Sequence, residues 1–371
     1  MNQRRICFVF SEINSSKTFE LLVLEAAKEY QCRVYIYGNS DNILRRRLQE
    51  ANIDTRIIHN RGNKLSFLKL CIRIFLIKAN RSTCFFTSGL TATYALLLRT
   101  YLKSNYLWIY IRHHSDVHNG KSVYQILDKL CTLRASCVIA VSKIVYDLLL
   151  SLNFDLNRIA LVHNGILLSE NSLLRSRNYP KSTWQIGIVS RVEPSKGVEF
   201  SLQALIDVSN YIDFEIWHVG EIGRFSENYR NLIQDKSINN RYKHFSWQED
   251  LSWFYSNIDI LIHVPITSSS ESFGMVYLEG IASGAICIFS RSGILNELSD
   301  QNNGIWIEVP CQNSQAISSA LHSVVHANLT SPNVRERKVL LDNFDLEKTI
   351  KSYLSLISEQ FIASHASSGK P

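Results

Sequence analysis

Short apolar runs alternate with amphipathic segments along most of this chain of 371 residues. The apolar runs at residues 6–10 and 260–264 predict buried strands, and apolar positions three and four apart over residues 18–30 predict a helix. Short apolar strands that alternate with helices are typical of a parallel sheet covered by helices on both faces. The pattern therefore predicts an α/β fold with doubly wound sheets.

The alternation falls into two series. The first predicts strands at residues 6–10, 33–37, 55–58, 84–87, 106–111, 137–141 and 159–162, and helices at 18–30, 45–52, 65–78, 91–102, 122–133 and 143–152. The second predicts strands at residues 185–190, 214–219, 242–245, 260–264, 285–289 and 304–309, and helices at 199–209, 226–236, 250–255, 274–284 and 314–327.

Two such series predict two tandem Rossmann-like domains that face a central cleft. Residues 164–179 are polar and follow neither period, which is typical of a linker. The predicted boundaries are a first domain at 1–165, a linker at 166–182, a second domain at 183–345, a last helix at 346–362 and a disordered tail at 363–371.

Composition indicates a soluble globular protein, with 46% hydrophobic and 20% charged residues. The eight cysteines form no C-x-x-C pair, and several lie in apolar runs, which predicts buried free thiols in a reducing compartment. The apolar run near the N-terminus is too short for a signal peptide, and no apolar stretch is long enough to span a bilayer. We therefore expect a cytoplasmic protein.

Charge divides unevenly along the chain. Residues 1–180 hold 25 Lys and Arg against 12 Asp and Glu, whereas residues 181–371 hold 15 against 21. The basic half suits an anionic partner, and the basic segments 45–47 and 64–81 could lie on an anionic membrane, for example on the inner face of the plasma membrane. An ordinary packed helix with a basic edge is an equal alternative for residues 64–81. Nucleic acid is not expected, because the basic residues are not interleaved with aromatics in a known module.

The stretch 260–297 carries the main candidate site. A strand, a Ser/Thr-rich loop, a turn at Gly274, a helix and a second strand form a βαβ unit, whose functional loop follows the first strand. Glu271 and Glu279 flank the turn. Carboxylates accept hydrogen bonds from sugar hydroxyls and helix amides donate to phosphate, so the stretch suits a ligand with both groups. Each glutamate alone also fits a solvated surface charge.

Two cations follow the first strand of the second series. Arg191 lies at the carboxyl end of that strand and Lys196 just before the next helix. They would neutralise a diphosphate and stabilise it as a leaving group without a metal. The alternative is a solvated turn, but the carboxyl ends of parallel strands share one crevice, where Arg191, Lys196 and Glu271 would meet.

A histidine pair follows the strand at 106–111 in the first domain. His113 and His114 suit a catalytic role at a strand end, and a purely structural role is the alternative. A metal site that also used Asp116 and His118 is disfavoured, because adjacent side chains on an extended chain point to opposite sides. We therefore expect no metal.

Several motifs are absent from the sequence. It has no G-x-G-x-x-G after the first strand, no G-x-x-x-x-G-K-[ST] and no G-x-S-x-G. These absences argue against a dinucleotide oxidoreductase, a P-loop nucleotide hydrolase and an α/β-hydrolase. The absence of a D-x-D pair argues against a sugar-nucleotide enzyme that chelates its diphosphate through a metal.

Four segments of the second half carry a family resemblance: IGIVSRVEPSKGVEFSLQAL, the glycine of WHVGE, WQEDLSWFYSNIDILIHVP, and ESFGMVYLEGIASGAICIFSRSGILNEL with its E-x7-E spacing. With them the chain resembles the retaining glycosyltransferases of family 4, which have the two-domain GT-B fold. The resemblance implies metal-independent transfer of a sugar from a nucleotide-diphosphate donor to a glycan or lipid-linked acceptor, with no cofactor. It also implies that the helix at 346–362 returns to the first domain.

The resemblance also assigns site residues. Arg191 and Lys196 would bind the donor diphosphate, Glu271 the donor sugar and Glu279 the ribose hydroxyls. The remaining donor-binding positions would be Gly220, Trp247, Phe273, Gly274, Met275 and Val276. Near the reacting carbon the family's histidine would be His113 or His114, and Ser15 and Asp116 are the acceptor-side candidates.

One departure from the family is visible. Many members carry a Gly-Gly turn after the first strand, where this chain has SEINSSKTFE. Two alternatives to transfer therefore stay open: a nucleotide-sugar epimerase or hydrolase on the same fold, and a non-catalytic protein that binds nucleotide sugars.

Overall fold

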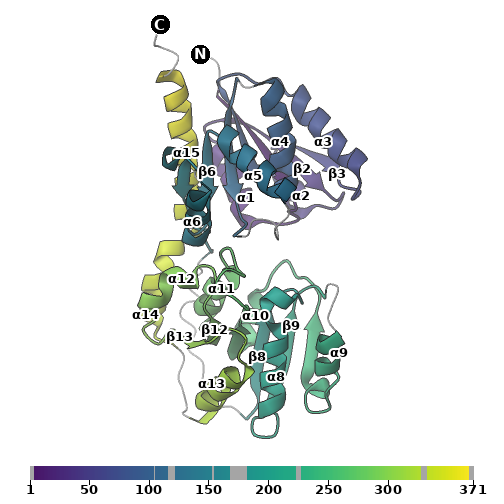
Figure 1. The fold of residues 1–371 in the computed structure, drawn as a ribbon, viewed down its shortest axis with the longest axis vertical. Coiled ribbons are helices and arrows are strands. Elements are labelled where there is room, and N and C mark those ends of the chain that lie inside the picture. The colour runs from purple at the N-terminus through teal and green to yellow at the C-terminus, as the bar shows by residue number, and fades with distance from the viewer. Residues whose placement is uncertain are drawn as a thin grey trace. The chain divides into compact units, whose positions relative to one another are not determined.

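The computed structural model describes residues 4–103, 105–115, 122–152, 154–167, 182–222, 227–326 and 332–366. Contacts divide the chain into two compact units (Figure 1). The first unit comprises residues 1–165 together with 346–371, and the second comprises residues 166–345.

The first unit is built on a parallel sheet of seven strands in the order β3-β2-β1-β4-β5-β6-β7. The central strand β1 is buried on both faces because its apolar run from Ile6 to Phe10 is fully enclosed. The strands are β1 (Arg5–Ser11), β2 (Gln31–Gly38), β3 (Asp54–His59), β4 (Thr83–Ser88), β5 (Leu107–Arg112), β6 (Cys137–Ala140) and β7 (Ile159–Leu161).

Helices cover both faces of this sheet. They are α1 (Lys17–Ala26), α2 (Ile43–Glu50), α3 (Lys64–Leu76), α4 (Leu90–Leu102), α5 (Ser122–Arg134), α6 (Lys143–Ser151) and α15 (Leu346–Ala366). The last of these, α15, packs on α1, with Phe361 stacked on Tyr30 at 5.7 Å between ring centroids. Phe361 is buried and its carbonyl accepts a hydrogen bond from the hydroxyl of Ser364, and α15 continues past its predicted end at residue 362. Residues 363–366 are therefore helical rather than part of a tail.

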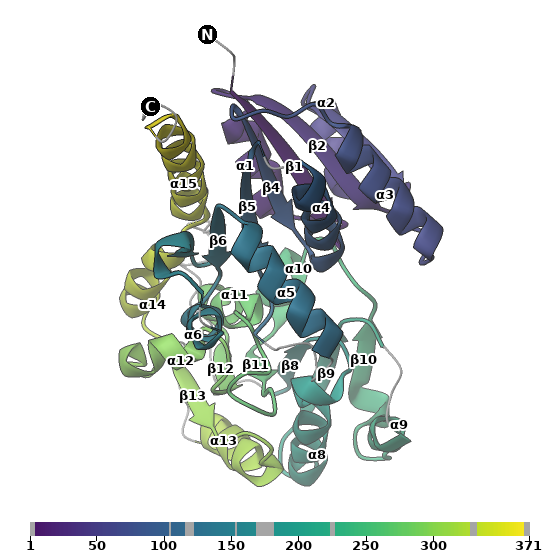
Figure 2. The same ribbon diagram turned by 45° about the horizontal axis from the view of Figure 1, so that its top comes forward.

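The second unit repeats the plan with a parallel sheet of six strands in the order β10-β9-β8-β11-β12-β13 (Figure 2). Its strands are β8 (Trp184–Val189), β9 (Phe214–Val219), β10 (Tyr242–Phe245), β11 (Ile260–His263), β12 (Ile286–Ser290) and β13 (Trp306–Val309). Its helices are α8 (Val198–Val208), α9 (Glu227–Ile233), α10 (Ser252–Asn257), α11 (Met275–Ser283), α12 (Leu295–Leu298), α13 (Ser314–His326) and α14 (Val334–Leu341).

The predicted α/β class with two doubly wound parallel sheets is confirmed. In both sheets the strand order reverses direction beside the first strand, between β1 and β4 and between β8 and β11. Ligands of such sheets bind at the carboxyl ends of the strands at this switch point. Among the described residues, no helix is both long enough and apolar enough to cross a membrane.

Candidate functional site

The switch point of the second unit brings two distant segments together. β8 and β11 are hydrogen-bonded neighbours, so the turn after β8 meets the loop after β11. Ile266 donates its backbone N–H to the carbonyl of Ser195 at 3.2 Å. This contact fixes the Lys196 turn beside the segment that carries Glu271.

Gly197 makes the close approach of these segments possible. The turn ends in a short 3-10 helix, Pro194–Lys196, and Gly197 follows in the left-handed region with φ 68°. A Cβ at this position would lie 1.9 Å from the carbonyl oxygen of Val264. Only glycine fits there, and it aims Lys196 across the end of β11.

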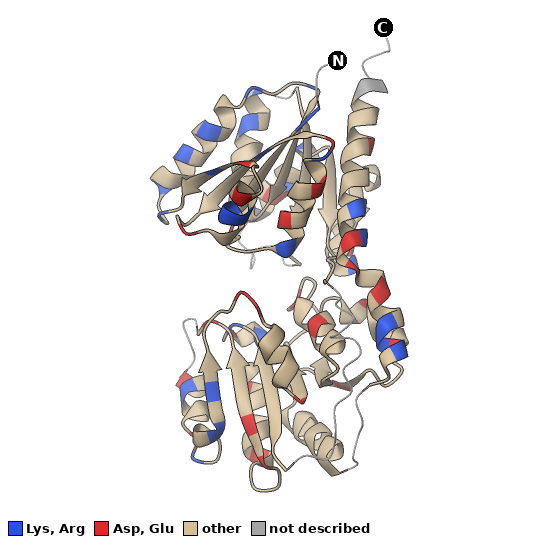
Figure 3. Cartoon of the chain, turned by 180° about the vertical axis from the view of Figure 1, so that it is seen from behind, with Lys and Arg blue, Asp and Glu red and all other residues tan. Residues whose placement is uncertain are grey.

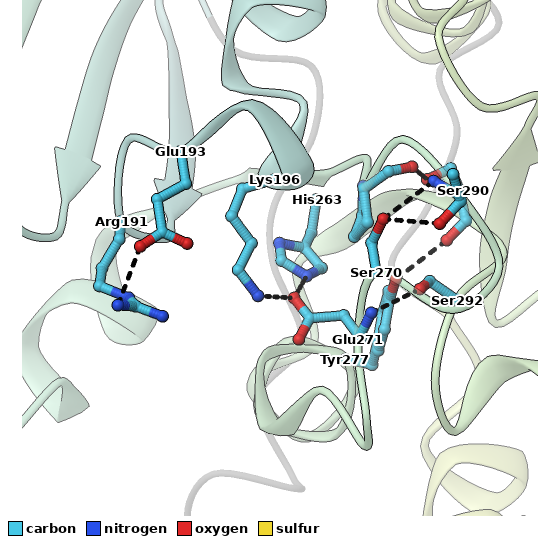
Figure 4. Close-up of polar contacts among 11 residues, drawn as sticks. Arg191, Glu193, Lys196, His263, Ser270, Glu271, Tyr277, Ser290 and Ser292 are labelled. Atoms are coloured by element: carbon cyan, nitrogen blue, oxygen red, sulfur yellow. Dashed lines mark hydrogen bonds and ion pairs between the residues drawn. The ribbon is translucent and has the colours of Figure 1, made fainter. Parts of the chain in front are cut away.

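Glu271 is the centre of the site. Its Oε1 accepts from Nζ of Lys196 at 2.8 Å and from Nε2 of His263 at 3.0 Å, and its backbone N–H donates to Oγ of Ser292 at 2.9 Å (Figure 4). Burial raises the pKa of the Glu271 carboxyl, but the hydrogen bonds and charges of His263 and Lys196 outweigh burial and lower it to about 2. Glu271 is therefore a carboxylate at any physiological pH, and it can only accept hydrogen bonds.

The segment from Phe273 to Val276 leads into α11, which begins at Met275. Gly274 precedes the helix in the left-handed region, with φ 85°, and no side chain caps the first turn. The backbone N–H groups of Met275 and Val276 lie at this uncapped end, a few residues after Glu271 in the sequence. An uncapped helix N-terminus is suited to an anionic oxygen.

Arg191 lies at the same strand edge but does not join the Glu271 cluster. Its guanidinium pairs with Glu193 at 2.9 Å, and 60% of its side chain is exposed (Figure 4). Both predicted diphosphate cations are thus held by a carboxylate, Lys196 by Glu271 and Arg191 by Glu193. An incoming diphosphate would have to take over these contacts.

Glu279 lies one turn along α11 and makes a different contact. The hydroxyl of Tyr255 donates to its Oε2 at 2.7 Å, and burial raises the pKa of its carboxyl. Tyr255 thereby fixes the orientation of this half-buried carboxylate, and sequence reasoning did not identify it.

The two remaining donor-side candidates lie at the ends of β9 and β10. A Cβ on Gly220 would lie 1.9 Å from the carbonyl oxygen of Ser190, so this glycine allows β9 to pass the end of β8. Its role in the structure is close backbone packing, whereas the prediction concerned ligand approach. Trp247 follows β10 and is 46% exposed.

His113 lies at the carboxyl edge of the first sheet, one strand beyond the switch point between β1 and β4. It directly follows β5, and its Nε2 lies 3.1 Å from Oγ of Ser88 at the end of β4. Burial, with a smaller contribution from His114, lowers the pKa of His113 to about 4, so the ring is neutral at physiological pH. The preceding Arg112 is buried, pairs with Asp128 and donates to the carbonyl of His114 at 3.1 Å. His114 therefore has its backbone fixed by the same arginine that precedes His113.

The turn after β1 lacks the glycines that the family resemblance predicts, and a glutamate takes the left-handed conformation there. Glu12 occupies the left-handed region with φ 64°, and its carboxylate accepts from the hydroxyl of Thr91 at 3.0 Å. The left-handed geometry is therefore supplied by a glutamate that has a local partner. Ser15 lies in the same turn and is partly buried, whereas Asp116 lies outside the described residues.

Sequence reasoning missed two residues that hold Glu271. His263 is 2% exposed and sits in an otherwise apolar strand, where its polarity was the only signal. Ser292 follows β12 and is fully buried. Gly293 beside it leaves room for the loop, because a Cβ there would lie 2.9 Å from the Cβ of Glu271.

Comparison with known families places this site in a recognised segment. Residues 170–338 match the family glycosyl transferases group 1. This match supports a glycosyltransferase. It covers the turn with Lys196, the loop with Glu271 and the helix with Glu279.

Two curated relatives agree with the match. The chain is 25% identical over 169 residues to N-acetyl-alpha-D-glucosaminyl L-malate synthase of Bacillus anthracis, covering 44% of this chain and 42% of the relative. It is 25% identical over 243 residues to an uncharacterized glycosyltransferase of Methanocaldococcus jannaschii, covering 63% and 57%. The chain thus spans about half the length of the curated relatives it matches.

Solved structures show the same fold over nearly the whole chain. The HepE protein of Anabaena, solved in complex with UDP-glucose, aligns with a TM-score of 0.76 at 16% identity, covering 96% of this chain and all of that one. Sucrose-phosphate synthase of Thermosynechococcus elongatus aligns with a TM-score of 0.75 at 17% identity, covering 97% and 100%. The chain therefore has the GT-B fold of two Rossmann-like domains. Among its described residues, no three His, Cys, Asp or Glu side chains are grouped to hold a metal ion.

Proposed function

We propose that the protein is a retaining glycosyltransferase that needs no metal and moves a sugar from a nucleotide-diphosphate donor to an acceptor hydroxyl. The observation that carries the proposal is the contact of Lys196 with Glu271 at the switch point, beside the uncapped start of α11. This arrangement offers a cation and helix amides for phosphate, and a carboxylate for hydroxyls, within one loop cluster. The family match and the nucleotide sugar bound by HepE support it.

The proposed chemistry assigns a task to each side chain. The bond between the anomeric carbon and the diphosphate oxygen breaks, and the electron pair leaves with the diphosphate. Arg191, Lys196 and the first amides of α11 stabilise that charge. A new bond forms from the acceptor oxygen to the same face of the carbon, and the proton of the acceptor passes to the departing phosphate. Glu271 holds hydroxyls of the donor sugar and Glu279 those of the ribose.

The acceptor that we propose is a lipid-linked or polysaccharide precursor of the cell envelope, used on the cytoplasmic side. The basic first half of the chain supports an acceptor that carries negative charge. In this proposal His113 or His114 lies near the reacting carbon, with Ser15 and Asp116 on the acceptor side. The neutral state of His113 suits a group that donates one hydrogen bond to a sugar hydroxyl.

The test compares Lys196→Ala and Glu271→Gln with the wild type. We expect each to lower the transfer rate at least about 100-fold, since each removes a charge that acts on the reacting group. Lys243→Ala is the matched control, because Lys243 makes a similar ion pair with Glu215 at 2.8 Å on β10 and β9. NMR of the product gives the anomeric configuration, and a chelator tests the metal requirement. Unchanged rates in both site variants would refute the site assignment.

One observation favours a second candidate, a protein that binds nucleotide sugars without transferring them. The turn after β1 holds the Glu12 side chain where the family resemblance expects glycines. Thermal shift with a panel of nucleotide sugars separates the candidates, because a ligand that binds only the folded state raises its stability. Binding without turnover on a broad acceptor panel would support the second candidate, and release of free sugar without an acceptor would indicate a hydrolase.

A further inference from the structure

One face of the first unit is both apolar and basic. α3 packs on α4 and α4 on α5, and right-handed crossovers place all three on the same face of the sheet (Figure 1). Their large apolar side chains that point outward are 49–74% exposed: Leu65, Leu68, Ile72 and Leu76 on α3, Leu98, Tyr101 and Leu102 on α4, and Val123, Ile126 and Leu133 on α5. We call these ten residues the α3–α5 face. Clustered exposure of this extent marks an interaction site rather than an ordinary surface.

Among the described residues of α3, α4 and α5, every exposed charge is positive. Residues 55–115, which include all of α3 and α4, contain ten Lys and Arg but no Asp or Glu. Lys64, Lys69 and Arg73 are exposed on α3 beside its apolar stripe, and Figure 3 shows blue and tan but no red along this helix. The acidic residue of α5, Asp128, is buried with Arg112 and does not offset the surface charge.

The helix α3, which carries four of the ten residues of this face, is firmly attached. Arg99 of α4 is 3% exposed and donates to the carbonyls of Phe75 and Ile77 at 2.8 Å each, which satisfies the C-terminal end of α3. On the inner side of α3, Leu70 and Ile74 are fully buried. The exposed apolar residues of α3 thus belong to a helix whose inner side is already packed against its own unit.

We propose that the α3–α5 face binds the surface of an anionic membrane, with its leucines and isoleucines among the acyl chains and its cations among the headgroups. Apolar side chains flanked by Lys and Arg match a bilayer surface in both polarity and charge. A second copy of the chain fits less well, because two faces of the same sign would repel. A single-stranded nucleic acid is disfavoured because the exposed residues are mainly aliphatic and offer few stacking platforms. The proposal does not depend on sugar transfer.

The structure excludes the other basic segment, 45–47, from this surface. α2 packs with α1 on the opposite face of the sheet. Arg47 pairs with Glu20 at 3.1 Å and Arg45 donates to the carbonyl of Ser40, which leaves Arg46 as the exposed arginine of the three. The prediction that residues 45–47 and 64–81 act together is therefore replaced by the α3–α5 face alone, and Arg46 becomes a control position.

The experiment is co-flotation of the full chain with vesicles of phosphatidylcholine, alone or with about one third phosphatidylglycerol. We expect binding to the anionic vesicles and at least about tenfold less binding for Leu68→Gln/Ile72→Gln and for Lys69→Glu/Arg73→Glu. The matched controls are Tyr211→Gln/Val339→Gln, exposed apolar residues of the second unit, and Arg46→Glu/Lys351→Glu, which makes the same change in net charge. Both controls should bind as the wild type does.

Two results would overturn the proposal: a wild type that never floats with anionic vesicles, or face variants that float as well as the wild type. Light scattering at matched concentrations identifies a second copy as the occupant if the wild type is a dimer and the Leu68/Ile72 variant a monomer without any vesicle binding. If the apolar variant fails to fold, the charge variant decides, since Lys69 and Arg73 are solvent-exposed. Transfer to a water-soluble acceptor is measured in parallel, so failure of membrane binding and failure of transfer are distinguishable.

Discussion

Nε2 of His263 lies 3.0 Å from Oε1 of Glu271, inside a strand whose other residues are apolar. An ionised carboxylate only accepts, so the imidazole donates through Nε2. The same oxygen also accepts from Lys196, on the side of the turn after β8. Glu271 is therefore held from two sides, by a buried group of the strand that precedes its loop and by a cation that a diphosphate would also attract.

The first prediction concerns this buried donor. His263→Phe keeps a ring in the strand but removes the hydrogen bond, so the Glu271 carboxylate is free to turn and its pKa should rise because burial is then less opposed. We expect kcat to fall about 10- to 100-fold, with a smaller change in the KM of the donor, since the residue positions a group rather than contacting the sugar. His263→Gln, which can still donate, should recover much of the rate. Steady-state kinetics across pH measures both effects.

A purely structural role for His263 predicts a different result. Both variants would then lose thermal stability while keeping kcat and the acid limb of kcat/KM. An equal fall in kcat in His263→Gln and His263→Phe, with no recovery by glutamine, would contradict the proposal that His263 positions Glu271 through a hydrogen bond.

The elements that sequence patterns predict best are those with an apolar run or a full amphipathic period. β9 and β10 agree with their predicted bounds because polar residues or glycine interrupt the pattern at both ends: Asp213 and Gly220 for β9, Arg241 and Ser246 for β10. α14 was missed since its sequence, VRERKVLL, resembles a solvated charged segment. In fact Arg337 is fully buried and donates to the carbonyls of Ile281 and Ala282 at 3.3 Å, so an arginine occupies a core position.

The candidate site was predictable in part for a similar reason. Strand ends and glycine turns can be found by local pattern, and sheet topology then implies that Lys196 and Glu271 share an edge. The partners that fix each group are long-range and leave little local trace. Tyr255 reaches Glu279 from a separate helix, and Ser292 reaches the Glu271 backbone from the turn after β12. Such contacts depend on packing rather than on spacing.

The second prediction isolates the close approach at Gly197. Gly304 has a similar backbone conformation, φ 77° against 68°, but a Cβ there would have no atom within 4 Å. Gly304→Ala should thus cost about 1 kcal/mol, the cost of a left-handed alanine. Gly197→Ala carries the same cost plus the clash with the Val264 carbonyl, for a total of at least about 3 kcal/mol. Urea unfolding of both variants measures the difference, and equal losses would contradict the packing described for this turn.

The third prediction concerns the buried pair of Arg112 and Asp128, both 1% exposed. Asp128→Asn leaves the guanidinium without its counter-charge, which should destabilise the first unit by about 3–5 kcal/mol. The control is Asp147→Asn, since Asp147 pairs with Lys143 at 3.2 Å on the exposed side of α6 and should contribute less than about 0.5 kcal/mol. A small effect at Asp128 in urea unfolding would mean that water or another group takes over the buried charge.

The fourth prediction concerns acid destabilisation through His218. This residue is fully buried; its Nε2 donates to the carbonyl of Ser190 at 3.0 Å, and its Nδ1 lies 2.6 Å from the hydroxyl of Tyr242. The neutral ring satisfies both contacts, with Tyr242 as the donor to Nδ1. Burial lowers its pKa from 6.5 to about 4, with a smaller contribution from His244.

The sign of the effect follows from these two pKa values. Between pH 6.5 and about 4 the unfolded chain binds a proton at this histidine that the folded unit does not bind. The stability contributed by the neutral ring is therefore complete above pH 6.5 and is lost as the pH falls through about 4. The loss amounts to about 3 kcal/mol at most.

His218→Gln should lower the free energy of unfolding at neutral pH but make it fall less steeply between pH 6.5 and 4.5. This range lies above the ordinary pKa of 4.5 of the Glu271 carboxyl, so that group begins to titrate only at lower pH. Ile216→Val, a buried change on the same strand, should lower stability by about 1 kcal/mol with the wild-type pH slope. Urea unfolding at a series of pH values compares the three proteins, and an unchanged slope in His218→Gln would exclude this histidine as a source of the acid sensitivity.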